Sequence, residues 1–131
     1  PVPWIVEPRP GGDNWSGFDD ERRQIADAIA EADIDNVMMV SGDAHMVAID
    51  DGTNSDYSTD GDAGFPVFHA AALDRPGNVK GGPYSDGAFP GGGQFGLLDI
   101  ADDGDTISVT TTGLNWEGGI LVQRTFTFDG Q

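Results

Sequence analysis

A short apolar run that ends in a glycine turn constrains the fold of this chain more than any other stretch. Residues 37–40 are four consecutive apolar residues, Gly42 follows, and Asp43 and His45 come directly after it. A run of this length predicts a strand buried on both faces of a sheet, and the glycine permits a sharp turn at its end. Because sites in open α/β sheets lie at the carboxyl ends of strands, Asp43 and His45 are expected at such a position.

The residues before this run predict a helix. Three consecutive acids at residues 19–21 suit the positive end of a helix, and the helix is expected to extend to about Asp33. Its apolar stripe is expected to be Ile25, Ala28, Ile29 and Ala32, with Arg22 facing elsewhere. A helix that leads at once into a buried strand is a unit of the α/β kind.

The last third predicts three antiparallel strands. Residues 95–100, 106–112 and 120–128 are rich in β-branched and aromatic side chains and are separated by turns that contain glycine. The stretch before them, residues 74–93, is punctuated by Gly and Pro and is expected to be one long loop. The expected fold class for residues 1–131, taken as a single unit, is α/β (α+β), a helix-strand unit followed by an antiparallel β meander.

The charge balance argues against two classes of partner. The chain has 23 acidic and 6 basic residues, a net charge of -17, which repels phosphate backbones and anionic lipid surfaces. No nucleic-acid partner and no membrane insertion are expected, and no apolar run is long enough to span a bilayer. The absence of cysteine excludes disulfides and thiolate metal sites. The excess of Asp over Lys also fits a halophilic scaffold whose surface acids only serve solvation.

Asp43 and His45 are the main candidates for chemistry. A carboxylate oxygen and an imidazole nitrogen suit divalent or trivalent metals such as Mn, Fe, Zn or Mg. The alternative interpretation is an exposed aspartate beside a histidine that its surroundings satisfy. Two ligands do not complete a catalytic metal site, which needs at least three protein ligands and an open position. His69, the other histidine, lies in an apolar stretch and is expected either in the core or in contact with the ligand residues without binding a metal itself.

The loop at residues 50–62 supports a different hypothesis, an acidic calcium-binding or association domain without catalysis. It holds five aspartates, Asp50, Asp51, Asp56, Asp60 and Asp62. Residues 56–61 have the alternating oxygen donors of the first half of a calcium loop. The bidentate acid expected six residues after Gly61 is absent, because that position is Val67.

Three motifs occur in a defined order in the first third of the chain. They are Asp13-x-Trp15-x-Gly17-Phe18, the pair Glu21-Arg22 at the start of the helix, and Ser41-Gly42-Asp43-x-His45 after Asn36-Val37. Together they resemble the C-terminal part of the alkaline phosphatase D family, which belongs to the calcineurin-like metallophosphoesterases. The chain departs from the family at Ser16 and Phe18, where aspartate and tyrosine are common.

The resemblance implies an αββα sandwich with two metals between the sheets, and hydrolysis of phosphomonoesters or phosphodiesters by metal-activated water. On this reading His45 would bind the first metal, and Asp43 would sit at or beside the second. The metals implied are Fe, Mn, Ca, Mg or Zn, and an aspartate in place of the first histidine favours a hard ion such as Ca or Mg at the second site.

The resemblance also implies partners and a location. Gly-Asp-x-x-Asp and Gly-Asn-His, two of the earlier ligand motifs of the superfamily, do not occur in this chain, and its one Asp-x-His, Asp43-x-His45, is the last motif on this reading, so the first motif has no counterpart either. These earlier motifs are expected upstream of Pro1, so the partners are a small phosphate-ester substrate and the missing N-terminal part of the same protein. The isolated chain is expected to be inactive or nearly so. A secreted or periplasmic location is implied by the same resemblance.

Overall fold

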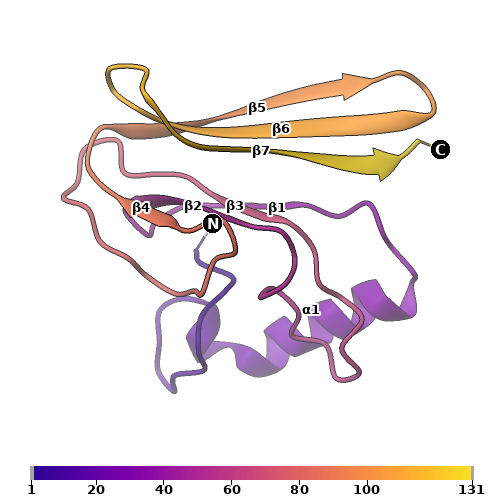
Figure 1. Cartoon of the computed structure of the whole chain (residues 1–131). Coiled ribbons are helices and arrows are strands. Elements are labelled where there is room, and N and C mark those ends of the chain that lie inside the picture. Colours follow the sequence, from indigo (N-terminus) through magenta and orange to yellow (C-terminus); the bar gives the residue numbers. More distant parts are fainter. Residues whose placement is uncertain (1, 131) are drawn as a thin grey trace.

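Two β-sheets are stacked on one another in the computed structural model, which describes residues 2–130, and one helix covers the outer side of the first sheet (Figure 1). The four-stranded sheet has the order β1 (Met39–Ser41), β3 (Val67–His69), β2 (Met46–Asp50) and β4 (Ala88–Pro90). The three-stranded sheet consists of β5 (Gln94–Asp102), β6 (Thr106–Asn115) and β7 (Ile120–Asp129). The chain is therefore of the mixed α/β class that was expected, with strands dominating.

The helix α1 (Asp19–Glu31) follows a single 3-10 turn, η1 (Trp15–Gly17), and it occupies most of the range predicted for it. Its buried face is different from the predicted one. Arg22 and Ala26 are fully buried, whereas Ile25 is 39% exposed, so the predicted apolar stripe is wrong except at Ile29, which packs against the core. This helix, found between residues 2 and 130, is neither long nor apolar enough to span a bilayer.

The physical reason for this difference is the set of partners around Arg22. Its guanidinium donates hydrogen bonds to the carbonyl oxygens of Trp4 and Val6 at 2.8 Å each. It also pairs with Asp19 at 2.6 Å and lies 3.5 Å from the centroid of the Tyr57 ring. A buried arginine with this many partners holds the N-terminal segment against the helix.

The most buried strand is β2 and not β1. Every residue of β2 is buried, whereas Val40 in β1 is 51% exposed. The prediction of a strand buried on both faces at residues 37–40 is therefore wrong. Only Met39–Ser41 forms a strand, and it lies at the sheet edge, paired in parallel with β3 alone. The apolar residues that follow His45, Met46–Ile49, belong to the central strand β2.

Two hydrophobic clusters lie on the two faces of β2. The helix side holds Met46 and Ala48 together with Trp4, Ile5, Ala26, Ala44, Phe65 and Val67. The meander side holds Val47 and Ile49 together with Phe68 and Phe126. Alternation along one strand thus supplies both cores, as the period of two in a β-strand requires.

The antiparallel meander β5–β6–β7 confirms the three predicted strands, each somewhat longer than expected. Gly96 and Gly113 are register partners in it, and a Cβ at either position would collide with side chains of the first sheet, Phe68 and Val47 respectively. The short strand β4 was not predicted and lies in the expected loop at residues 74–93. Three residues that end in a proline carry too little periodicity to reveal a strand.

Candidate functional site

Asp43 and His45 lie in the turn that joins β1 to β2. The turn follows the carboxyl end of β1, which runs parallel to its neighbour β3, so the predicted position at a strand end is confirmed. The Asp43 side chain is 54% exposed and His45 is half-buried, whereas Ala44 between them is fully buried. The turn is therefore anchored in the core through Ala44.

Both candidate ligands have a left-handed backbone. The φ angles are 73° at Asp43 and 53° at His45, and within residues 2–130 the only other non-glycine residue with positive φ is Asp33. For a residue with a side chain this conformation costs about 1–2 kcal/mol. Such strain persists only where the surrounding structure holds it, and it clusters at functional sites.

His69 is the residue that holds the turn. Its Nε2 accepts a hydrogen bond of 3.0 Å from the backbone N–H of Ala44, and its Nδ1 lies 2.7 Å from Oγ of Ser41. Because Nε2 accepts, the proton of a neutral ring is on Nδ1 and is donated to the serine oxygen. His69 is fully buried in β3, so its predicted place in the core is confirmed.

Burial lowers the pKa of His69 to about 4, because the protein interior disfavours the charged ring. The nearby carboxylate of Asp43 opposes this shift and the ammonium of Lys80 adds to it, but both are smaller effects than burial. The imidazole is therefore neutral at physiological pH, which agrees with the accepting role of Nε2.

The loop at residues 74–80 closes over the turn. The N–H of Asn78 donates to the carbonyl oxygen of His45 at 3.2 Å. Nζ of Lys80 lies 3.5 Å from the Asp43 carboxylate and 3.3 Å from its carbonyl oxygen. Both ends of this ion pair are partly exposed, so it contributes little to stability. The carboxylate is thus held by a weak cation contact that a bound metal ion could replace.

An open hollow of about 460 Å³ borders the same loop, and Arg75, Gly93 and Trp116 are among its lining residues. Arg75 is three residues before Asn78, and three residues span at most about 11 Å. Within residues 2–130 the guanidinium of Arg75 has no salt bridge. A hollow with Arg75 and the exposed Trp116 in its lining therefore borders the loop that contacts the turn.

The described residues do not assemble a full ligand set. No group of three or more His, Cys, Asp or Glu side chains suited to a metal ion occurs among residues 2–130. The His45 ring makes no hydrogen bond in that range, so its nitrogens are available. The donor types fit one side of a metal site, and a metal bound tightly here needs ligands beyond these two.

The aspartates of the loop at residues 50–62 mostly have other partners. Asp50 is fully buried, and its carboxylate accepts four hydrogen bonds, from the backbone N–H groups of Gly52, Asn54 and Ser85 and from the Asn54 side chain. Asp56 accepts two hydrogen bonds from Ser58. These carboxylates act as acceptors that shape the loop.

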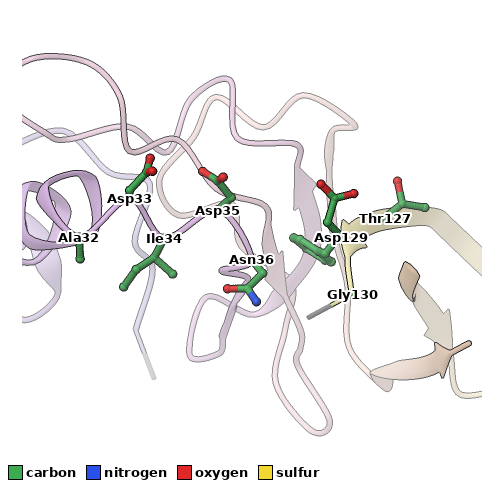
Figure 2. A pocket seen from close by; sticks show the side chains of 9 residues that line it. Ala32, Asp33, Ile34, Asp35, Asn36, Thr127, Asp129 and Gly130 are labelled. Atoms are coloured by element: carbon green, nitrogen blue, oxygen red, sulfur yellow. The ribbon is translucent and has the colours of Figure 1, made fainter. Parts of the chain in front are cut away.

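Another hollow, of about 520 Å³, lies away from Asp43 and His45. Figure 2 shows it between residues 32–36, which lead into β1, and residues 127–130 at the end of β7. It is therefore at the amino end of β1, whereas the candidate ligands follow the carboxyl end. Within residues 2–130 its charged lining residues are the acids Asp33, Asp35 and Asp129, and no cation is among the residues that line it.

Comparison of the chain with protein-family models, with curated proteins and with solved structures finds no match. Two residues of the site were missed by sequence reasoning. Ser41 and Lys80 are brought to the turn by the pairing of β1 with β3 and by the closing loop, and no local pattern around them signals either contact. His69 was detectable only through its apolar neighbours.

Proposed function

We propose that this chain contributes Asp43 and His45 to a metal-dependent phosphoesterase site that hydrolyses small phosphate mono- or diesters. The observation that carries the proposal is the turn itself. Both residues have a left-handed backbone, and a buried neutral histidine holds the turn from behind. Strain that is maintained in this way by the core is typical of functional turns.

Two further features support this function. The layers follow the order helix, sheet, sheet, which agrees with three layers of the αββα sandwich that the motif resemblance implies. The hollow that borders the loop at residues 74–80 offers Arg75 as a cation for an anionic ester and Trp116 as an apolar surface for its organic part. The remaining ligands would come from a part of the protein outside these residues, and a secreted or periplasmic location belongs to the same proposal.

The roles of the residues follow from their positions. When bound, metal ions such as Fe, Mn, Ca, Mg or Zn supply Lewis acidity for attack on the phosphoryl group by water. His45 offers a neutral nitrogen and Asp43 a carboxylate oxygen. His69 orients the turn without touching substrate, because both of its nitrogens are engaged by Ser41 and Ala44. Lys80 pairs with the Asp43 carboxylate and would be displaced by a metal ion bound at Asp43.

Titration of the chain with Mn²⁺, followed by paramagnetic broadening of its NMR signals, tests the proposal. The signals of Asp43 and His45 should broaden first, and His45→Ala should abolish this selectivity. Asp33→Ala is the matched control for Asp43→Ala, since Asp33 is also an exposed aspartate with positive φ. Broadening that is unaffected by Asp43→Ala or His45→Ala would overturn the assignment.

Activity separates the proposal from its alternatives. With a chromogenic phosphodiester and added Mn²⁺, the chain alone is expected to show no turnover or very little. Robust turnover that His45→Ala abolishes would instead show a complete site in these residues. The alternative of an acidic calcium-binding domain predicts tight calcium binding that is lost on Asp56→Ala and Asp60→Ala and kept on Asp43→Ala.

A further inference from the structure

The three-stranded sheet β5–β6–β7 has one strand fewer than the four-stranded sheet on which it is stacked. Gly96 in β5 faces Phe68 in β3, and Gly113 in β6 faces Val47 in β2. In β7, Arg124 reaches Asp86 just before β4, at 2.6 Å. All three strands of the meander contact the central strand β2 of the four-stranded sheet. Since strands in a sheet are about 4.8 Å apart, a strand added beside β5 would widen the three-stranded sheet by about that distance.

The free edge of β5 presents unpaired backbone groups. The N–H of Gln94 donates to the carbonyl oxygen of Ala72, on the side away from β6. Because backbone groups alternate along a strand, those of Gly96, Leu98 and Ile100 point to the same side. Beyond Gln94, no backbone hydrogen bond from the free side of β5 is found within residues 2–130.

Apolar side chains are left uncovered along this edge. Leu98 and Ile100 share the inner face with Gly96, by alternation, and they are 44% and 65% exposed. The edge has no lysine, proline or bulge, which are the usual devices that keep an edge strand from pairing.

The charge of the edge defines what can occupy it. Asp99 lies on the outer face of β5 and Asp102 ends the strand, and neither forms a salt bridge within residues 2–130. A second copy of the chain does not complement them, because β5 has no basic residue and each copy has a net charge of -17. Opposite charges on facing positions stabilise strand pairs.

We propose that the free edge of β5 binds a β-strand of a partner polypeptide, with apolar residues that cover Leu98 and Ile100 and with lysine or arginine beside Asp99 and Asp102. The added strand becomes the fourth strand of the three-stranded sheet, and its backbone forms hydrogen bonds with the unpaired backbone groups of β5. This interaction surface is independent of the proposed phosphoesterase site.

A nine-residue peptide that alternates valine and lysine, capped at both ends, is the probe for the intact chain. It should bind with one-to-one stoichiometry in calorimetry. Hydrogen exchange at the amides of Gly96, Leu98 and Ile100 should slow by about tenfold or more, since these amides gain bonds. The amides of Leu97 and Asp99 already bond to β6 and should change little.

Leu98→Asp and Leu97→Asp are a matched pair of variants, because both leucines are exposed on the same strand and face opposite sides. Leu98→Asp should weaken binding about tenfold, from lost apolar contact, and Leu97→Asp by less than about twofold. Asp99→Lys should weaken binding of the lysine peptide about two- to fivefold and favour a peptide with glutamate in place of lysine.

Four results would overturn the proposal. They are the absence of binding, equal effects of the two leucine variants, equal binding of the glutamate peptide to the unmodified chain, and self-association of the chain that Leu98→Asp abolishes. The last result, read by sedimentation without peptide, would make a second copy the occupant. Circular dichroism of each variant confirms that the chain is folded.

Discussion

The two connections on either side of β2 use their aspartates in opposite ways. In the loop after β2, the buried carboxylate of Asp50 accepts four hydrogen bonds from the protein. In the turn before β2, Asp43 is exposed and contacts only the side chain of Lys80, while His69 forms the buried hydrogen bonds. A carboxylate that accepts hydrogen bonds from backbone N–H groups stabilises the fold, whereas a carboxylate that is exposed to solvent is available to bind a ligand.

Removal of the Asp50 carboxylate is the strongest test of this contrast. Asp50→Ala removes a fully buried carboxylate and leaves the part-buried N–H groups of Gly52, Asn54 and Ser85 without their acceptor. We expect a loss of about 3–5 kcal/mol in the free energy of unfolding, measured with urea, because each buried unsatisfied donor costs about 1–3 kcal/mol.

Asp56→Ala is the control in the same loop. Asp56 is half-buried and accepts hydrogen bonds only from Ser58, so the expected loss is within about 1 kcal/mol. Similar losses for the two variants would mean that burial does not distinguish the carboxylates of this loop.

The pH dependence of stability tests the other connection. The folded-state pKa of His69 is about 4, against 6.5 for a free imidazole. The unfolded chain therefore takes up the proton first as the pH falls, and stability present above pH 6.5 is lost toward pH 4. The full loss amounts to about 3 kcal/mol at 1.36 kcal/mol per pH unit. Urea unfolding at a series of pH values between 7 and 5 measures the part of this stability loss that occurs above pH 5, where the carboxylates titrate less.

The two histidines provide the control for this measurement. His69→Gln keeps an acceptor for the Ala44 N–H and should flatten the pH dependence, whereas His45→Gln should leave the His69 part unchanged. In NMR, the His69 ring should remain neutral down to about pH 5. Protonation of His69 near pH 6.5 would contradict the buried hydrogen bonds of its ring.

The smallest expected effect concerns backbone strain in the turn. Asp43→Gly replaces a left-handed aspartate by a residue that adopts φ 73° freely, and it should stabilise the chain by up to about 1 kcal/mol. Asp33→Gly, at φ 52°, should have a similar effect. Thermal unfolding compares them. Only Asp43→Gly should also remove the selective Mn²⁺ broadening, which separates strain from ligation.

The elements with long, regular patterns were predictable from sequence. The helix and the three meander strands are nine or more residues long each, and the acids at the start of the helix, the β-branched and aromatic side chains of the strands and the turns between them define these elements. The run at residues 37–40 misled the prediction for a physical reason. An apolar run shows that a segment can be buried, but only the order of strands in the sheet puts β2 in the centre and leaves Val40 at the edge.

The position of the site was predictable from sequence, but the long-range contacts that hold it were not. Gly42 and the strand before it placed Asp43 and His45 at a strand end, and the structure agrees. The pairing of Ser41 with His69 spans 28 residues, and the buried position of Arg22 depends on carbonyl groups 16 and 18 residues away. Contacts at such separations carry no local signature, so they become visible only in the folded chain.

The glycine pair of the meander has a consequence for how the sequence can vary. Gly96 and Gly113 face each other across β5 and β6, and the side chains of Phe68 and Val47 fill the space that two Cβ atoms would take. Larger residues at either glycine are compatible with this packing only when the opposing side chain shrinks. In related chains, positions 96 and 68, and positions 113 and 47, are therefore expected to change as pairs.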